Sequence, residues 1–272
     1  KKEEIDRSVK EKLAPKQFTK TPINGTKFTI LVSSAKGGVG KSTVAINIAF
    51  ALQSLGLKIG ILDADVYGPS LPKLINLNEK PKSEDGKAMM PLEKYDAQFM
   101  SMGFLVDEQT PMIWRGPMVI SAIKTMTQKV LWKDRDVIII DMPPGTGDTQ
   151  LTFAQEVKVD GAIIVSTPQD LALLDVKRGI QMFDKTGVKI LGLIDNMSFF
   201  KGDDGKVYKI FGESGVEKTA KDFKKEFLGY LPIHKDLRSS ADIGDPITHS
   251  DPEHEVSKLF IDIAKKIKLS LI

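Results

Sequence analysis

The sequence lacks cysteine entirely, although it is 272 residues long. This absence excludes disulfide bonds, thiolate nucleophiles and every metal centre that depends on cysteine ligands. Histidine is scarce as well, and the three histidines, His234, His249 and His254, show no ligand spacing along the chain. The histidine pattern therefore predicts no metal site.

Long hydrophobic runs are also missing. No stretch approaches the roughly 18–20 apolar residues that cross a bilayer, and the first residues, KKEEIDRSVKEK, lack the apolar core of a secretory signal. The net charge is +3, but no basic run is interleaved with aromatic residues, so nucleic-acid binding is not expected. A content of 41% hydrophobic and 28% charged residues is typical of a globular protein with an ample core.

A short strand, a glycine-rich turn and a helix follow one another near the start of the chain. Phe28 to Val32 form an apolar, β-branched run, and helical spacing of apolar residues begins at Thr43. This order of elements is the context in which a phosphate-binding loop is expected. The loop, AKGGVGKST, consists of Ala35, Lys36, Gly37, Gly38, Val39, Gly40, Lys41, Ser42 and Thr43.

The residue types in this loop fit the binding of a nucleotide phosphate. Its three glycines let successive backbone N–H groups turn inward around an anion, and the helix adds the positive end of its dipole. Lys41 is predicted to contact the β- and γ-phosphates, and the Ser42 hydroxyl to bind Mg²⁺. The loop therefore predicts a nucleotide site that uses Mg²⁺.

Ala35 and Lys36 set this loop apart from the common pattern. Ala35 replaces the first glycine, which is compatible with a negative φ. Lys36 adds a second ammonium group near Lys41, and their repulsion is unfavourable unless an anion is bound. A lysine here resembles the deviant loop of the MinD, ParA, nitrogenase iron protein and ArsA class of ATPases, in which it reaches the partner subunit's nucleotide. The alternative is an ordinary solvated lysine.

A second buried strand, residues 57–63, leads into the aspartates Asp63 and Asp65. Ligands of open α/β sheets bind at the carboxyl ends of the strands. Asp63 is predicted to hold Mg²⁺, directly or through water, and Asp65 to orient or deprotonate the attacking water. Alternatively, either aspartate caps the turn that precedes Gly68.

A further hydrophobic strand, residues 136–141, ends in Asp141 and is followed by a Gly/Pro-rich turn. This is the Walker B pattern, in which the aspartate holds Mg²⁺ through water. The backbone N–H of Gly145 in the turn is predicted to sense the γ-phosphate. Asp141 and the phosphate loop together predict a site for a nucleotide with Mg²⁺.

Asn196 follows another predicted strand, residues 188–194. A carboxamide at a strand end is able to hydrogen-bond a base, although a strand-end asparagine also serves simply as a turn residue. The GTPase pattern N-K-x-D is absent, which favours adenine over guanine.

Strands and helices alternate from residue 27 onward. The alternation predicts a single α/β domain over residues 27–272, with a doubly wound, mostly parallel sheet and helices on both faces. Residues 1–26 are predicted to form a polar helix and linker, residues 76–110 a hairpin-like excursion over the sheet, and residues 199–211 a hairpin. A C-terminal helix carries an apolar stripe from Val256, which either docks on the sheet or lies on an anionic membrane.

The motifs AKGGVGKST, LDADVYGPS, MSMGF, WRGPM, DMPPGTGD, VSTPQD and NMS occur in the order seen in the Mrp/ApbC family, which includes mitochondrial Ind-type proteins. The resemblance extends from about Ile23 to Phe260. It implies a MinD- and nitrogenase-iron-protein-like fold, a homodimer, Mg-dependent ATP binding with slow hydrolysis, and iron–sulfur cluster assembly or transfer. By matching position, it assigns Lys36 to the partner's nucleotide, Asp65 to hydrolysis and Asn196 to adenine.

The resemblance also implies partners and a location. The expected partners are a second copy of the chain and apo iron–sulfur proteins or assembly factors, without nucleic acid or membrane. The expected location is the cytoplasm, or the mitochondrial matrix in a eukaryote.

The chain departs from the family after the NMS motif. Family members usually place Cys-x-x-Cys there, and two subunits together hold one [4Fe–4S] cluster. This chain has Gly202 and Gly205 at the aligned positions, and glycine supplies no ligand. We therefore expect an ATPase connected with iron–sulfur protein maturation that acts without its own cluster. One alternative is a MinD- or ParA-like nucleotide switch that positions cargo or docks on a membrane, and another is a scaffold that binds ATP without turnover.

Overall fold

The computed structural model describes residues 20–83, 86, 88–105, 116–145, 147–213 and 215–271. Within them, one eight-stranded sheet has the order β10-β7-β6-β1-β5-β2-β4-β3. Neighbouring strands are parallel except for the pair β3 and β4. The strands are β1 Thr26–Ser33, β2 Ile59–Asp63, β3 Leu92–Lys94, β4 Ala97–Ser101, β5 Arg135–Asp141, β6 Gly161–Ser166, β7 Ile190–Asp195 and β10 Phe227–Tyr230.

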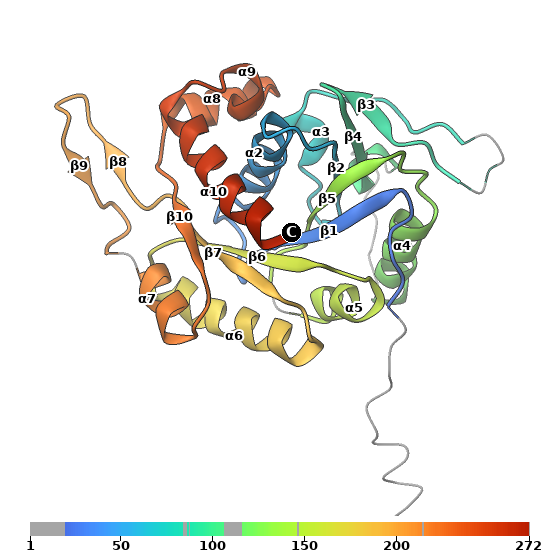
Figure 1. The fold of residues 1–272 in the computed structure, drawn as a ribbon, viewed down its shortest axis with the longest axis horizontal. Helices are drawn as coiled ribbons and strands as arrows, with labels where there is room; N and C mark the ends of the chain where they lie inside the picture. Colours follow the sequence, from blue (N-terminus) through green and yellow to red (C-terminus); the bar gives the residue numbers. More distant parts are fainter. Residues whose placement is uncertain are drawn as a thin grey trace, which may run out of the picture.

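Helices cover both faces of this sheet (Figure 1). One layer contains α2, α3, α8, α9 and α10, and the other contains α4, α5, α6 and α7. The bounds are α2 Lys41–Ser54, α3 Leu71–Leu74, η1 Met102–Phe104, α4 Gly116–Gln128, α5 Asp148–Glu156, α6 Asp170–Thr186, α7 Gly215–Asp222, α8 Lys235–Ile243, α9 Ile247–Ser250 and α10 Glu255–Leu271. The doubly wound, mostly parallel α/β fold expected from the sequence is confirmed.

The central strands are apolar along their length because both faces of the sheet are covered. β2 and β6 are buried at every residue, and the run Val137–Asp141 of β5 is buried throughout. Parallel pairing places the carboxyl ends of these strands at one edge of the sheet. There Asp141 lies opposite Val32 of β1 on one side and opposite Asp63 of β2 on the other. The fold thus brings the strand-end residues singled out in the sequence together.

The prediction for residues 76–110 is wrong in one respect. β3 and β4 do form a hairpin, but it does not lie over the sheet, because β4 pairs in parallel with β2 and extends the sheet at its edge. Residues 84, 85, 87 and 106–110 of this segment lie outside the described residues, as do residues 1–19 of the predicted N-terminal helix and linker.

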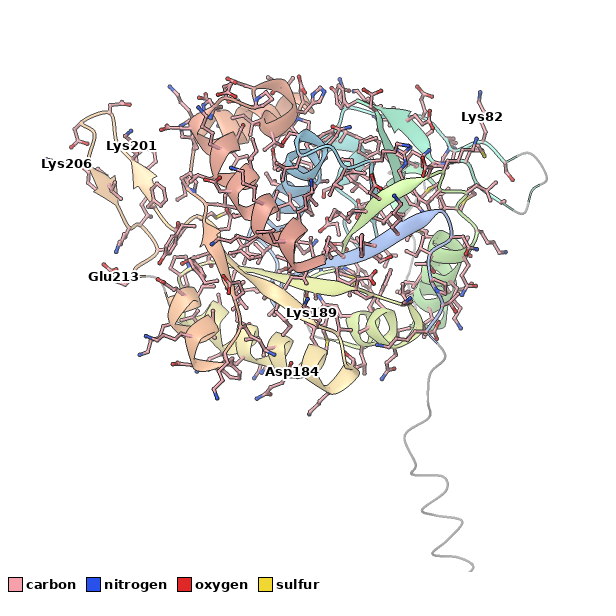
Figure 2. The ribbon with its side chains drawn as sticks, in the orientation of Figure 1. Lys82, Asp184, Lys189, Lys201, Lys206 and Glu213 are labelled. Atoms are coloured by element: carbon pink, nitrogen blue, oxygen red, sulfur yellow. The ribbon has the colours of Figure 1, made fainter. Side chains whose placement is uncertain are left out.

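The hairpin predicted at residues 199–211 is present as β8 Phe200–Lys201 and β9 Val207–Tyr208. It projects from the body of the molecule (Figure 1), and Figure 2 labels Lys201 and Lys206 on it. Its turn contains both Gly202 and Gly205, and Gly205 has a φ of +75°.

The apolar stripe of the C-terminal helix is buried. Val256, Phe260, Ile263 and Ile267 of α10 are at most 2% exposed, and the helix packs against α2. This packing argues against a membrane-docking role for the stripe. Among the described residues, no helix is long and apolar enough to cross a bilayer.

Candidate nucleotide site

A buried ion pair lies at the centre of the strand-end edge. The Lys41 ammonium, at the start of α2, contacts Asp141 Oδ1 at the end of β5, at 2.5 Å. Lys41 and Asp141 are 6% and 4% exposed. Burying two charges is costly unless they are paired, so the pairing keeps the site charged while it is shielded from water. The structure thereby joins the phosphate-loop lysine to the predicted Walker B aspartate.

The backbone of the phosphate loop turns at its glycines. Gly38 and Gly40 adopt φ values of +81° and +78°, which non-glycine residues rarely reach. Gly40 is also the N-cap of α2, and no side chain caps this helix terminus. The first backbone N–H groups of the helix, with the positive end of its dipole, therefore face the loop as an anion-binding surface.

A small cavity of about 260 Å³ lies over this surface. Ser42 and Thr43 line it from the loop, and Asp65 and Ser70 line it from the segment after β2. The hydroxyl of Ser70 is buried and has no hydrogen-bond partner among the described residues, so it is available to a ligand. Ser70 was not predicted as a site residue, although it belongs to the motif LDADVYGPS.

Asp63 is fully buried at the end of β2. Its Oδ2 accepts hydrogen bonds from the Ser70 and Leu71 N–H groups and the Ser101 hydroxyl at 3.0–3.1 Å, and its Oδ1 accepts from the Asp65 N–H at 3.1 Å. Burial, together with the nearby Asp141 carboxylate, raises the pKa of Asp63 to about 7. The observed contacts orient the segment that carries Asp65, and the predicted Mg²⁺ contact of Asp63 stays a prediction.

Asp65 is partly buried beside the cavity. Burial raises its pKa above the ordinary aspartate value, while the Lys41 ammonium opposes the rise. Its Oδ1 accepts weak hydrogen bonds from the Tyr67 and Gly68 N–H groups, at 3.2 and 3.3 Å. Asp65 therefore combines the turn-capping role with a position next to the predicted phosphate site.

The turn after β5 is tied to the end of β1. The Gly145 N–H, predicted to sense the γ-phosphate, donates to the Ser34 carbonyl at 2.9 Å. Gln150 of α5, which is 1% exposed, donates to the Pro143 carbonyl at 2.6 Å and accepts from the Ser33 hydroxyl at 2.9 Å. Gln150 couples the turn to the phosphate-loop strand, a role that no sequence motif indicated.

Asn196 lies against the phosphate loop. Its Nδ2 donates to the Val39 carbonyl at 2.8 Å, and a Cβ on Gly40 would come within 2.4 Å of that nitrogen. Its Oδ1 is buried without a partner among the described residues, which leaves an acceptor for a base amino group. Lys36, by contrast, is exposed at the outer side of the loop.

The residues present fit ATP with Mg²⁺. Glycine N–H groups, the Lys41 ammonium and the Ser42 hydroxyl line one cavity, and the Asp141 carboxylate lies directly behind it in contact with Lys41. This set matches the donors and hard oxygen ligands that phosphates and Mg²⁺ require. The residues do not fit a [4Fe–4S] cluster, because the chain has no thiolate and Gly202 and Gly205 offer no donor.

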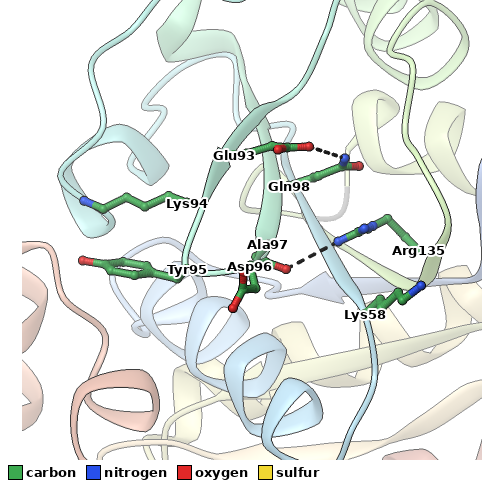
Figure 3. Close-up of a pocket in the computed structure, with 8 residues that line it drawn as sticks. All are labelled: Lys58, Glu93, Lys94, Tyr95, Asp96, Ala97, Gln98 and Arg135. Atoms are coloured by element: carbon green, nitrogen blue, oxygen red, sulfur yellow. Dashed lines mark hydrogen bonds between the residues drawn. The ribbon is translucent and has the colours of Figure 1, made fainter.

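A larger cavity, of about 510 Å³, lies away from this site and near the amino ends of β4 and β5 (Figure 3). Several of its charged groups have partners: Lys94 donates to the Ile75 carbonyl, Lys58 pairs with Asp134, and Glu93 accepts from the Gln98 amide. Lys58, Glu93 and Lys94 are therefore already engaged. Its lining residues are Lys58, Glu93, Lys94, Tyr95, Asp96, Ala97, Gln98 and Arg135.

The elevated pKa of Asp63 predicts how stability changes with pH. Between about pH 4 and pH 7 the unfolded chain has lost the Asp63 proton while the folded chain retains it. This group's contribution to the free energy of unfolding therefore falls as pH rises through this window, by at most about 4 kcal/mol. The free energies of unfolding of the wild type and Asp63→Asn are measured with urea in Mg-free buffer at a series of pH values. As the pH rises from about 4 to about 7, the wild type should lose stability relative to the variant. Parallel pH curves would contradict the prediction.

Three comparisons place this geometry among known proteins. The family model described as NUBPL iron-transfer P-loop NTPase, of the ParA type, matches residues 25–268. The "Iron-sulfur cluster transfer protein NUBPL" of Dictyostelium discoideum is 50% identical over 254 residues, covering 92% of this chain and 79% of the relative. The "Iron-sulfur cluster carrier protein" of Escherichia coli K12 is 46% identical over 251 residues, covering 92% and 68%.

Solved structures agree with the fold. A nucleotide-binding protein of Archaeoglobus fulgidus in complex with ADP has a TM-score of 0.72 and 36% identity, covering 88% of this chain and 91% of that one. The cell division ATPase MinD of Pyrococcus furiosus has a TM-score of 0.66 at 20% identity, covering 89% and 99%, which supports the fold alone. The resemblance found from the motifs is confirmed, and the chain belongs to the family of NUBPL-type iron-transfer P-loop NTPases.

Proposed function

We propose that this protein is a homodimeric ATPase that binds Mg-ATP, hydrolyses it slowly and acts in the assembly or transfer of iron–sulfur clusters to apoproteins. The proposal that the protein binds and hydrolyses Mg-ATP rests on the buried contact between Lys41 and Asp141 beside an open phosphate loop. Family membership supports the iron–sulfur part.

The ion pair suggests what happens when the nucleotide enters. The Lys41 ammonium is neutralised by Asp141 at 2.5 Å. Phosphate oxygens would compete for the same ammonium, so Lys41 would turn toward them, and Asp141 and the Ser42 hydroxyl would then hold Mg²⁺. Mg²⁺, when bound, neutralises phosphate charge and fixes the orientation of the γ-phosphate. Asp65, beside the cavity, then orients the attacking water.

Two features support a composite site in a dimer. The cavity of about 260 Å³ is smaller than the roughly 300–1,000 Å³ usual for ligand pockets, so part of the nucleotide would need contacts from elsewhere. Lys36 is exposed on the loop and available to a second copy. In a two-fold dimer, the Lys36 of each subunit would stabilise the transition-state charge at the partner's γ-phosphate.

Mixed dimers test this arrangement. Lys36→Ala and Asp65→Ala should each retain ATP binding and lose most hydrolysis. In a heterodimer of the two variants, one composite site regains both groups, so an equal mixture should recover about a quarter of the wild-type rate. The measurement is steady-state phosphate release after subunit exchange. No recovery, with heterodimers shown to form by native mass spectrometry, would count against action across the interface.

A transfer assay tests the iron–sulfur role. An apo [4Fe–4S] enzyme is incubated anaerobically with a cluster-loaded scaffold, with and without this protein and Mg-ATP, and its reactivation is followed. We expect faster reactivation that requires ATP and is lost in Lys41→Ala. The same rate of reactivation with and without the protein would exclude the role.

The proposed location is the cytoplasm, or the mitochondrial matrix in a eukaryote, as in the mitochondrial relative of Arabidopsis thaliana.

A further inference from the structure

Two of the three histidines, which are 20 residues apart in the sequence, meet in the fold. His234 is the N-cap of α8, Asp236 lies in the first turn of that helix, and His254 directly precedes α10. The imidazole rings of His234 and His254 lie edge to face, with centroids 5.1 Å apart. Both histidine side chains are 20% exposed and Asp236 is 46% exposed, so the group is sheltered but open to solvent. The expectation from spacing alone overlooked this contact.

We propose that His234, Asp236 and His254 bind one divalent ion of the first transition row, Zn²⁺ or Fe²⁺. One ligand atom from each residue lies within 4.8 Å of the others, and among the residues that the structure describes these three form the one such group of histidine and carboxylate side chains. Two imidazoles and one carboxylate are the donor set of zinc sites and of mononuclear non-haem iron sites. The site is separate from the phosphate loop and does not depend on the nucleotide proposal.

The distances suit a small ion. With metal–ligand bonds of about 2.0–2.1 Å, tetrahedral geometry separates two ligand atoms by about 3.3 Å. Asp236 Oδ2 lies 3.3 Å from His254 Nε2 and 3.7 Å from His234 Nδ1. The carboxylate oxygen is thus already near the required separation from both nitrogens, and rotation of the side chains has to close the remaining histidine–histidine gap.

Glu255 supports His234 from the other side of the ring. Its Oε1 lies 3.4 Å from His234 Nε2, near enough to favour the proton on that nitrogen, while Nδ1 accepts a hydrogen bond from the Asp236 N–H. Histidine ligands of metals usually donate their second N–H in this way, which fixes the ring and raises its basicity. A metal on Nδ1 replaces the present hydrogen bond from the Asp236 N–H, at 3.2 Å.

The second histidine has to change tautomer. His254 Nδ1 accepts from the Val256 N–H at 3.1 Å, so its Nε2 carries the proton and faces Asp236. A metal on Nε2 moves that proton to Nδ1 and releases the Val256 contact. Binding therefore sacrifices two backbone hydrogen bonds, and we expect an affinity below that of a preformed structural zinc site.

The group formed by His234, Asp236 and His254 lies close to the base of the projecting β8–β9 hairpin. The Ile233 N–H, next to His234, donates to the Phe199 carbonyl at 2.8 Å, and Lys201 of β8 lies 3.9 Å from Glu255. A metal here would fix the start of α8 and the start of α10 to the base of the hairpin. Figure 1 shows the hairpin and α8 on the same side of the molecule.

Metal titration of the untagged full-length chain tests the proposal. After treatment with EDTA and dialysis into buffer with excess Mg²⁺, which competes for sites made of oxygen ligands alone, Zn²⁺ binding is measured by competition with a chromophoric chelator. Co²⁺ serves as the spectroscopic probe and Fe²⁺ is added anaerobically. We expect one ion per chain and a tetrahedral Co²⁺ spectrum. His234→Gln and His254→Gln should weaken Zn²⁺ binding more than about 100-fold, and Glu255→Gln about tenfold.

A matched control exists in the chain. His249 pairs with Asp245 and stacks on Tyr95, outside the group, so His249→Gln should bind Zn²⁺ like the wild type. Asp236→Asn removes only the charged ligand and serves if a histidine variant fails to fold. An unmodified chain that binds neither Zn²⁺ nor Co²⁺ below millimolar concentration would overturn the proposal. So would equal Zn²⁺ affinity in the wild type, Asp236→Asn and His254→Gln.

Discussion

Replacing Lys41 with alanine is expected to weaken Mg-ATP binding 30- to 1,000-fold, which corresponds to roughly 2–4 kcal/mol. The ammonium group is buried at the start of α2, and the adjoining cavity is lined by loop glycines, Ser42 and Thr43. A charged contact to phosphate in a shielded site is stronger than one in water, and no other described cation lines this cavity. Isothermal titration calorimetry with a slowly hydrolysed ATP analogue measures the loss.

The ion pair complicates the interpretation of this variant. Lys41→Ala leaves Asp141 buried without its partner and beside Asp63, and removing one member of a buried pair typically costs about 3–5 kcal/mol of stability. The matched control is Lys41→Ala combined with Asp141→Asn, which removes both charges. Thermal unfolding separates the two effects, because the double variant should recover stability but not nucleotide affinity. ATP affinity that is unchanged in a folded Lys41→Ala chain would refute the nucleotide site.

The parts of the site that follow from local sequence were predictable. A strand, a glycine loop and a helix that begins at Lys41 are set by residues close together in the chain, and parallel pairing then brings Asp63 and Asp141 to the same edge. The apolar runs of β2, β5 and β6 identify a sheet that is covered on both faces. The local sequence pattern and the expected sheet topology together were sufficient to predict where these residues lie.

The remaining contacts depend on pairings between distant residues. Ser101 reaches Asp63 only because β4 adds in parallel beside β2, whereas the sequence suggested a hairpin lying over the sheet. Gln150 connects the phosphate-loop strand to the turn after β5, and the His234–His254 contact requires α8 and α10 to converge. No motif or periodicity in the sequence indicates such contacts, so they could not be predicted from the sequence alone.

The unmodified protein is expected to fail to assemble a [4Fe–4S] cluster while it still turns over ATP. A cluster between two subunits needs about four soft anionic ligands, and the chain has no cysteine to supply them. No histidine lies between Asn196 and Phe211, and Asp203 and Asp204 are hard oxygen donors. Anaerobic reconstitution with iron and sulfide, followed by desalting, should leave a colourless protein without acid-labile sulfide. A mononuclear ion at His234 and His254 would add iron but no sulfide, so the sulfide assay distinguishes the two.

Gly202→Cys combined with Gly205→Cys tests whether only the thiolates are missing. Gly205 has a φ of +75°, where a side chain costs about 1–2 kcal/mol. A Cβ on Gly202 would lie 2.8 Å from Oδ1 of Asp204, a side chain that is 44% exposed. The hairpin turn projects from the body of the molecule, so it is able to relax, and we expect a cluster in the double variant. Gly202→Ser with Gly205→Ser is the matched control, because it imposes the same strain without a thiolate and should stay colourless. For the unmodified protein, absorbance near 400 nm with about four irons per two chains would contradict the prediction that it assembles no cluster, because those irons would need ligands other than thiolates.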